Sequence, residues 1–170
     1  RCDVPLAAEP EATLPLLTEA LRKRTKKSTV KMRHQALAKR ALADRKKWDK
    51  AALTEAKRTP IGFQWASRCI NELFGPNTIV VNEYPLDPRH APPTGPGTYF
   101  GASHARGLGW GFGAALGAKL GAPGKTVICT LGDGSYIFGV PTACHQVSRA
   151  SNLPLLIIVF NNGAWDEVSN

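Results

Sequence analysis

The sequence has no long apolar run, no secretory leader and no collagen repeat. Its longest unbroken apolar run, residues 153–160, contains a proline and is too short for a bilayer, which takes about 20 residues. The opening Arg1-Cys2-Asp3 is not a charged region followed by an apolar core. Glycine and proline follow no three-residue period, which excludes collagen. We therefore expect no membrane partner.

Paired cysteines are also lacking. None of the four cysteines, Cys2, Cys69, Cys129 and Cys144, forms a CxxC pair, so zinc spacing is absent. The pattern favours reduced, buried thiols in a cytoplasmic compartment. An organelle is the alternative for a eukaryotic source.

The remaining composition is that of a soluble globular chain. The 170 residues are 43% hydrophobic and 21% charged, which excludes a largely disordered chain and fits one domain with or without attachments. The chain starts with Arg1, its only methionine is Met32, and residues 165–170 resemble the start of a helix. We expect a piece of a longer protein.

Acidic residues are scarce in one segment. Residues 22–58 hold 15 of the 22 Lys and Arg residues and only three acids, a net +12, and the rest of the chain carries a net −3. No Gly or Pro lies between Leu16 and Thr59, which favours a helix that starts near Leu14. We expect one helical face, made of Val30, His34, Leu37, Ala41, Trp48, Ala52 and Ala56.

Two interpretations of this basic segment stay open. A solvated helix packed along a neighbouring domain is favoured, because the segment has one aromatic residue and no recognisable nucleic-acid-binding motif. The alternative is a nucleic-acid or acidic-membrane patch, whose binding would weaken steeply with salt.

From Pro60 onward, helical and strand patterns alternate. Apolar spacing predicts helices over 60–74 and 107–124 and from about Tyr136, and strands over 78–82, 125–131 and 153–160. The inward residues would be Phe63, Ala66, Cys69, Ile70 and Leu73 in the first helix and Val140, Ala143, Cys144 and Val147 in the last. The last strand is apolar on both faces, as a buried parallel strand would be. Gly109, Gly113, Gly117 and Gly121 would share one helical face that allows close approach to a sheet or ligand. The alternation predicts an α/β fold with a parallel sheet and helices on both faces.

Polar clusters follow two of these strands. Gly132-Asp133-Gly134-Ser135 follows the second, and Asn161-Asn162-Gly163 follows the third, with 26 residues between Gly134 and Asn161. One helix and one return strand fit that interval, so both clusters should emerge at the same sheet edge. An Asp carboxylate and an Asn carbonyl are hard oxygen ligands, which suit Mg²⁺ that completes its shell with phosphates and water. The sequence therefore predicts a site for Mg²⁺ and a diphosphate.

The two-part motif, GDGS followed after 26 residues by NN, resembles the signature of thiamine-diphosphate-dependent enzymes. The sequence "GDGSYIFGVPTACHQ…LPLLIIVFNN" is similar to that of the acetolactate synthase, benzoylformate decarboxylase and pyruvate decarboxylase group. The resemblance implies thiamine diphosphate and Mg²⁺ as cofactors. It implies a lyase or transferase that acts on 2-oxo acids through a cofactor ylid and enamine, either by decarboxylation or by acetolactate synthase-like carboligation. It also implies a homodimer or homotetramer.

The resemblance assigns roles by position. The metal ligands would be the side chains of Asp133 and Asn162 and the backbone carbonyl of Ala164. The diphosphate would contact Gly132, Gly134 and Ser135, while Asn161 would brace the turn. Arg106, Leu108 and Gly109 match the segment that clamps the aminopyrimidine ring, with Leu108 under the cofactor. The family's activating Glu comes from a separate domain that no segment here resembles, and Glu83 is not its substitute by position. No catalytic residue is therefore expected in this chain.

The resemblance also suggests a domain division. Residues 1–21 would end a preceding middle domain, residues 22–59 would be a basic helical connector, and residues 60–170 would be the diphosphate- and Mg²⁺-binding domain, incomplete at its C-terminus. By itself this piece should bind cofactor weakly and turn nothing over. The alternatives are a non-catalytic cofactor-binding remnant of the same fold and a basic nucleic-acid-binding module.

Overall fold

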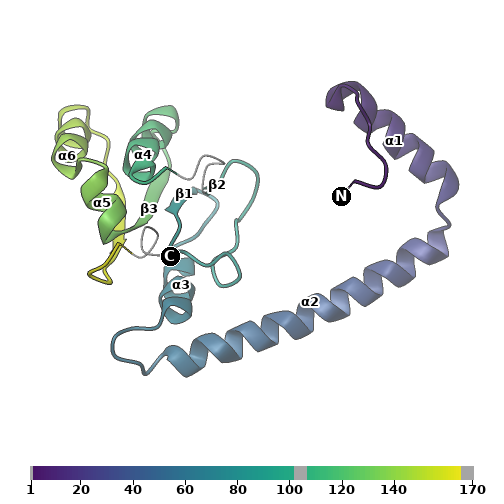
Figure 1. The fold of residues 1–170 in the computed structure, drawn as a ribbon, viewed down its shortest axis with the longest axis horizontal. Helices are drawn as coiled ribbons and strands as arrows, with labels where there is room; N and C mark the ends of the chain where they lie inside the picture. The colour runs from purple at the N-terminus through teal and green to yellow at the C-terminus, as the bar shows by residue number, and fades with distance from the viewer. Residues whose placement is uncertain (1, 102–106, 166–170) are drawn as a thin grey trace. The chain divides into compact units, whose positions relative to one another are not determined.

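The computed structural model describes residues 2–101 and 107–165. The chain divides between Lys46 and Lys47 into two compact units, a boundary that falls within helix α2. The first unit contains α1 (Pro10–Arg24) and most of α2 (Lys27–Glu55). The second contains α3 (Phe63–Asn71), β1 (Thr78–Glu83), β2 (Tyr99–Phe100), α4 (Trp110–Gly121), β3 (Thr126–Gly132), α5 (Asp133–Phe138), α6 (Pro141–Ala150) and β4 (Leu156–Phe160) (Figure 1).

The first unit differs from the continuous helix predicted from Leu14. Helix α1 begins earlier, at Pro10, where a missing N–H costs nothing, and it contains Pro15. It ends at Arg24, and the next residue, Thr25, caps it: the Thr25 N–H and Oγ1 both donate to the Leu21 carbonyl, at 2.9 and 2.6 Å. Five of the six residues from Arg22 to Lys27 are basic, and their mutual repulsion also disfavours a helix there.

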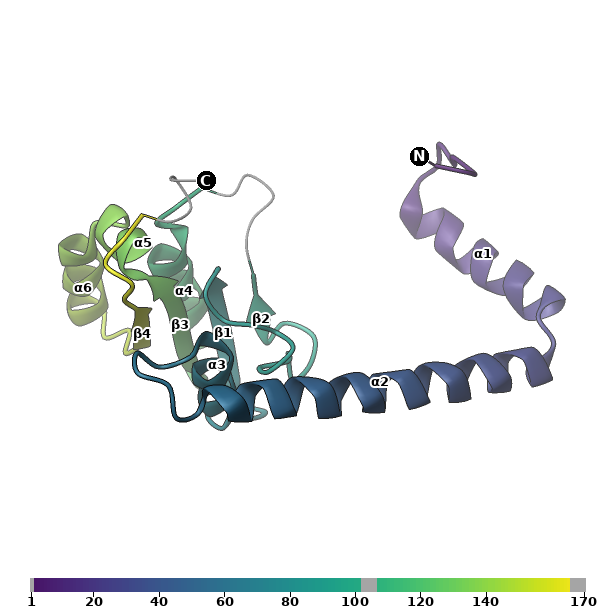
Figure 2. The same ribbon diagram turned by 60° about the horizontal axis from the view of Figure 1, so that its bottom comes forward.

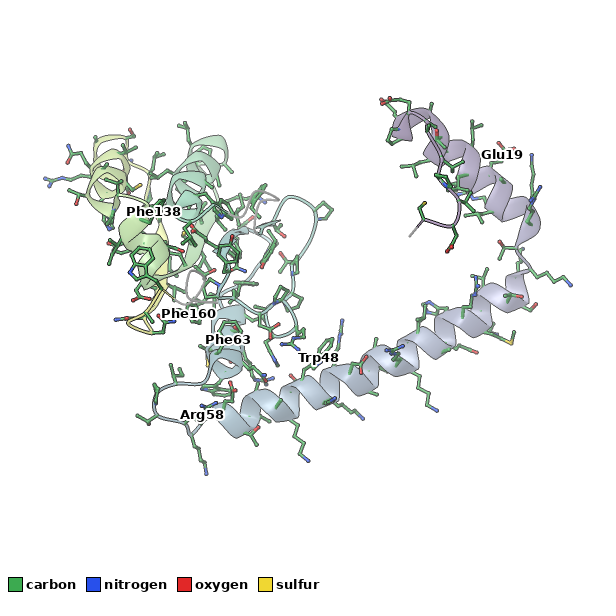
Figure 3. All side chains as sticks on the ribbon, viewed as in Figure 1. Glu19, Trp48, Arg58, Phe63, Phe138 and Phe160 are labelled. Atoms are coloured by element: carbon green, nitrogen blue, oxygen red, sulfur yellow. The ribbon has the colours of Figure 1, made fainter. Side chains whose placement is uncertain are left out.

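The predicted apolar face of the basic segment is not buried. Ala52 is the one buried residue that α2 contains, and Val30 and Leu37 are 51% and 66% exposed. Side chains project from α1 and α2 in all directions (Figure 3). None of the described helices has the length and apolar character needed to span a membrane.

The second unit is built on a four-stranded parallel sheet of order β2-β1-β3-β4. The predicted parallel α/β fold with helices on both faces is confirmed (Figure 2). On one face, Ile79 and Val81 of β1 pack with β3 residues and with Ala115 of α4. On the other face, Val80 packs with Ile70 of α3. The alternation along β1 thus buries both of its sides.

Strand β4 corrects the prediction of a fully buried strand over 153–160. It starts only at Leu156, and Leu156 and Val159 are 43% and 39% exposed. The reason is its place at the edge of the sheet, where β3 is its neighbour in the described chain. The two-residue strand β2 at the opposite edge was not predicted, because two residues give no periodic pattern.

The helix predicted after β3 is in fact two helices. Val140, expected to point inward, has a positive φ of 52° and separates α5 from α6, where Pro141 opens the second helix. Of the residues expected inside, Cys144 is partly buried against Phe112, Leu116 and Leu153, whereas Val140, Ala143 and Val147 are exposed.

Helix α3 also presents a different face from the predicted one. Ser67 and Ile70 are its buried residues, whereas Phe63, Cys69 and the flanking Leu73 are exposed. Together with Cys2, which is exposed as well, Cys69 contradicts the expectation that all thiols are buried.

Candidate functional site

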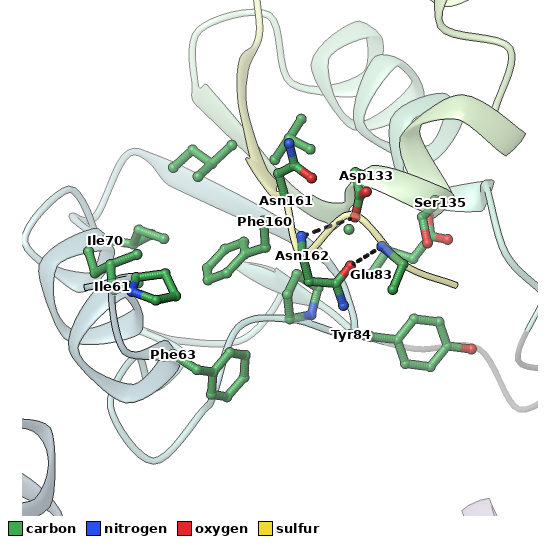
Figure 4. A pocket seen from close by; sticks show the side chains of 18 of the residues that line it. Ile61, Phe63, Ile70, Glu83, Tyr84, Asp133, Ser135, Phe160, Asn161 and Asn162 are labelled. Atoms are coloured by element: carbon green, nitrogen blue, oxygen red, sulfur yellow. Dashed lines mark hydrogen bonds between the residues drawn. The ribbon is translucent and has the colours of Figure 1, made fainter. Parts of the chain in front are cut away.

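The two polar clusters meet at the carboxyl ends of adjacent strands. Gly132 of β3 pairs in register with Phe160 of β4, so Asp133 and Asn161 leave the sheet side by side. The backbone N–H of Asn162 lies 3.4 Å from Oδ1 of Asp133, which accepts from it (Figure 4). The register of a parallel pair therefore brings together residues separated by 29 positions.

A tight turn follows β4. Asn161 Oδ1 accepts the Gly163 N–H, and Asn162 Oδ1 accepts the Ala164 N–H, both at 3.0 Å. These are Asn side chains bonded to the backbone two residues on, a typical way of fixing a turn. Gly163 takes a φ of 67°, which glycine adopts without strain. The turn fixes both side-chain amides at the sheet edge.

A cavity of about 910 Å³ opens beside these residues. Its polar side contains Gly132, Asp133, Gly134, Ser135, Asn161, Asn162 and Ala164. Its apolar side includes Ile61, which precedes α3, and Ile70, which lies on α3 (Figure 4). Phe63 and Phe160 also line this side, and their ring centroids lie 6.0 Å apart. The Trp165 ring covers Gly134 so closely that a Cβ there would lie 3.0 Å from Cε3.

Helix α5 is too short to serve as an anion site by itself. It has six residues and starts at Asp133, not near Tyr136 as predicted. Ser135 is 6% exposed and lies on the cavity wall.

The predicted ring-binding segment reaches the same cavity in part. Leu108 is half-buried and lines it together with Asp133 and Asn162. Gly109 precedes α4 with a φ of 83°. Arg106 lies outside the described residues.

Most of the glycine face predicted for α4 does not face the sheet. A Cβ at Gly113, Gly117 or Gly121 would meet nothing within 4 Å, so these glycines make no close approach to the sheet. The close approaches are at Gly109 and at Gly111, where a Cβ would lie 2.7 Å from Glu83 Oε2. The sheet side of α4 buries Gly111, Phe112, Ala115 and Leu116.

Glu83 was assigned no role in the site by the sequence analysis. This residue ends β1, is fully buried and lines the cavity. A charged residue only two positions after the β-branched run Ile79–Val81 was the available signal, because such a residue needs buried partners.

The donor set suits a hard cation that accompanies an anion. Among the described lining residues, Glu83 and Asp133 are the ionisable carboxyl groups, and there is no lysine or arginine to receive a diphosphate. No three His, Cys, Asp or Glu side chains gather as a metal cluster in the described ranges. Asp133 with the Asn162 amide and backbone carbonyls would leave positions for phosphate oxygens and water, as Mg²⁺ prefers. The residues present therefore fit Mg²⁺ bound together with a diphosphate.

Fold and site define a parallel α/β domain that gathers oxygen ligands at the carboxyl ends of its strands, where such sheets bind their ligands. Residues 87–170 match the family model described as "Thiamine pyrophosphate enzyme, C-terminal TPP binding domain". Through this segment the chain is similar to the C-terminal cofactor-binding domain of the thiamine pyrophosphate enzymes.

Individual relatives agree with this assignment. The chain is 38% identical over 82 residues to the acetolactate synthase large subunit of Haemophilus influenzae, covering 46% of this chain and 12% of that one. It is 40% identical over 70 residues to the benzoylformate decarboxylase of Pseudomonas aeruginosa, covering 41% and 13%. Among solved structures, the thiamine diphosphate-dependent 4-hydroxybenzoylformate decarboxylase of Rhodococcus jostii RHA1 matches with a TM-score of 0.52 and 26% identity, covering 64% of this chain and 21% of that one. The chain thus spans about an eighth of the length of these two curated relatives.

Proposed function

We propose that this chain supplies the Mg²⁺- and diphosphate-binding side of a thiamine-diphosphate-dependent enzyme that acts on 2-oxo acids. The observation that carries the proposal is the meeting of Asp133 and Asn162 at the ends of β3 and β4, on the wall of a cavity that Leu108 also lines. The relatives include both a synthase and decarboxylases, so both carboligation and decarboxylation fit the proposal.

Each residue has a proposed task. The side-chain oxygens of Asp133 and Asn162 and the carbonyl of Ala164 hold Mg²⁺. The backbone N–H groups of Gly134 and Ser135 and the Ser135 hydroxyl bind diphosphate oxygens. A diphosphate entering beside Asp133 would be repelled by the carboxylate without a cation, so Mg²⁺ and diphosphate should bind together.

The remaining residues orient the organic part of the cofactor. Leu108 packs under its rings, and the apolar side of the cavity excludes water from them. Thiamine diphosphate, when bound, supplies a carbon nucleophile for the keto carbon and stabilises the charge left as CO₂ departs.

Calorimetric titration of thiamine diphosphate into the 170-residue chain, with Mg²⁺ and then with EDTA, tests the proposal. We expect binding that requires Mg²⁺ and that weakens by about 100-fold or more in Asp133→Ala, because a carboxylate ligand to a divalent ion is lost. Glu72→Ala, which removes an exposed carboxylate after α3, is the matched control and should bind as the wild type does. Equal affinity in EDTA, or in Asp133→Ala, would contradict the proposal.

A further inference from the structure

Glu83 is a buried carboxyl group with two backbone donors. It is the last residue of β1, and its fractional exposure is 0%. Its Oε1 accepts the Gly109 N–H at 2.5 Å, and its Oε2 accepts the Gly111 N–H at 2.6 Å. Both side-chain oxygens are therefore engaged by the first turn of α4, 26 and 28 residues away. Free N–H groups at a helix start are the donors that such an acceptor satisfies.

The turn held by Glu83 is closely packed on two sides. On one side, a Cβ at Gly111 would lie 2.7 Å from Glu83 Oε2. On the other side, a Cβ at Gly109 would lie 2.8 Å from the Gly139 backbone nitrogen. Gly109 also has a φ of 83°, a conformation that a side chain would strain. The backbone from 109 to 111 is thus wedged between the end of β1 and the junction of α5 and α6.

This turn carries Leu108, the residue directly before Gly109. Leu108 lines the cavity, whereas Glu83 reaches that region from the sheet. The chain leaves β1 abruptly after Glu83, since Tyr84 has a positive φ of 76°. The Glu83 carboxyl group faces the start of α4, because it accepts the Gly109 and Gly111 N–H groups.

We propose that Glu83 is a positioning residue that sets the place of Leu108 on the cavity wall by fixing the Gly109–Gly111 turn. The proposal rests on the proposed function, because it concerns the ring-binding part of the same site. It separates two parts of that site. Asp133 and Asn162 act on the diphosphate and its cation, and Glu83 acts through Leu108 on the rings alone.

The chemistry of the side chain explains why glutamate is required. A glutamine has one acceptor oxygen, and its NH₂ group would face the second backbone N–H, donor against donor. An aspartate is one methylene shorter and cannot reach both amides from the same backbone position. We therefore expect a graded series in which Glu83→Ala is affected most and Glu83→Gln and Glu83→Asp are intermediate.

The first test is amide hydrogen exchange of the 170-residue chain, which needs no cofactor. In Glu83→Ala, exchange at Gly109 and Gly111, relative to Val81 in the core of β1, should become about tenfold faster or more, because each amide loses its acceptor. Gly111→Ala should give the same result, since its Cβ displaces the Glu83 side chain. The control is Gly113→Ala on the open side of α4, which should leave this ratio unchanged.

The second test compares two ligands, thiamine diphosphate and inorganic diphosphate, each titrated with Mg²⁺. Glu83→Ala and Leu108→Ala should raise the Kd for thiamine diphosphate by about tenfold and leave that for inorganic diphosphate within about twofold, because only the ring contact is lost. Asp133→Ala should weaken both ligands. Leu131→Ala, which only destabilises the fold, should not separate them.

Each outcome decides one claim. An unchanged exchange ratio in Glu83→Ala, or equal weakening of both ligands, would overturn the positioning role. If the wild-type chain binds neither ligand, the proposed function and the ring-orienting part of this inference fail together, and the exchange ratio still decides whether Glu83 holds the turn.

Discussion

Both units of this chain contain many apolar residues, but only the second unit buries them in a core. The first unit, up to Lys46, is rich in leucine and alanine, yet none of its described residues is buried. In the second unit, Val81, Leu131 and Cys129 have no measurable exposure. Apolar content and helix propensity are thus enough to form α1 and α2 but do not by themselves create a core.

The difference lies in how far apart the interacting residues are in the sequence. The interactions described within the first unit are local, such as the Lys23–Glu19 ion pair and the Thr18–Leu14 hydrogen bond, both four residues apart. The second unit is joined by contacts over long intervals, including Thr130 to Asn82 over 48 residues. Long-range contacts cost more chain entropy to form, and burial offsets that cost.

Thiol labelling should show the largest contrast between the units. Burial raises the pKa of Cys129 to about 12, and the charges of Glu83 and Cys144 act in the same direction. At pH 8, Cys129 in the native chain should react about 10³-fold more slowly than exposed Cys2, because the thiolate is the nucleophile. Mass spectrometry of alkylated peptides over time checks this, and equal rates would mean that β3 is not buried.

Truncation of one leucine in each unit should give the next largest difference. Leu131→Ala should cost about 2–5 kcal/mol of unfolding free energy, because it leaves a cavity in the core. Leu37→Ala, at a position 66% exposed on α2, should change it by less than about 0.5 kcal/mol. Urea denaturation measures both changes, provided that the m-value, the slope of unfolding free energy against urea concentration, is the same in each variant. A large loss in Leu37→Ala would show that α2 is covered in solution.

One polar side chain in each unit, Asn82 and Thr18, extends the comparison to hydrogen bonds. Asn82 donates to the Leu86 carbonyl and the Tyr99 hydroxyl, and its Oδ1 accepts from Leu86 N–H and Thr130. Asn82→Ala should therefore cost about 1–3 kcal/mol, since buried partners are left unsatisfied. Thr18→Ala, which removes one exposed hydrogen bond in α1, should cost a few tenths of a kcal/mol at most, on the order of a surface change. The same denaturation series measures both, and equal costs would remove the distinction.

The smallest expected effect concerns ion pairs and pH. Burial by itself would raise the pKa of Asp87, but hydrogen bonds and charge from Arg89, helped by His90, bring that pKa below its usual 3.8. The stability that Asp87 contributes is thus present above pH 3.8 and is lost as the pH falls through the lowered pKa. The stability difference between wild type and Asp87→Asn should shrink over that acid range, as Tm measured against pH would show. Glu19→Gln, in an exposed pair, should change stability at neutral pH by at most about 0.5 kcal/mol. A difference that grows on acidification would contradict the assignment.

The central strands and the site loops were predictable because their patterns are short and local. The apolar runs of β1 and β3 predicted strands within a residue or two, and the glycine–aspartate and double-asparagine clusters fell at the strand ends as predicted. The predicted helix start near Leu14 was too late, because Pro10 and Pro15 are tolerated in the exposed helix α1.

Features set by tertiary contacts were not predictable in the same way. Period-four spacing alone cannot tell which glycines of α4 face the sheet, and Gly111, outside the predicted series, is the one whose added Cβ would meet the Glu83 side chain. Likewise, the apolar pattern of β4 suggested full burial, but its place at the edge of the sheet determines its exposure. The role of Glu83 depends on amides 26 and 28 residues away, which no local pattern reveals.

The parallel sheet also offers a place to attach a reporter group. The four strands of the sheet run in one direction, so the turn before β3 lies at their amino ends, whereas Asp133 and Asn162 lie at their carboxyl ends. Gly124 in that turn is exposed, with nothing within 4 Å of where a side chain would start. A fluorophore joined to a cysteine introduced there could therefore follow unfolding or assembly while the strand ends that carry the ligand residues remain unlabelled.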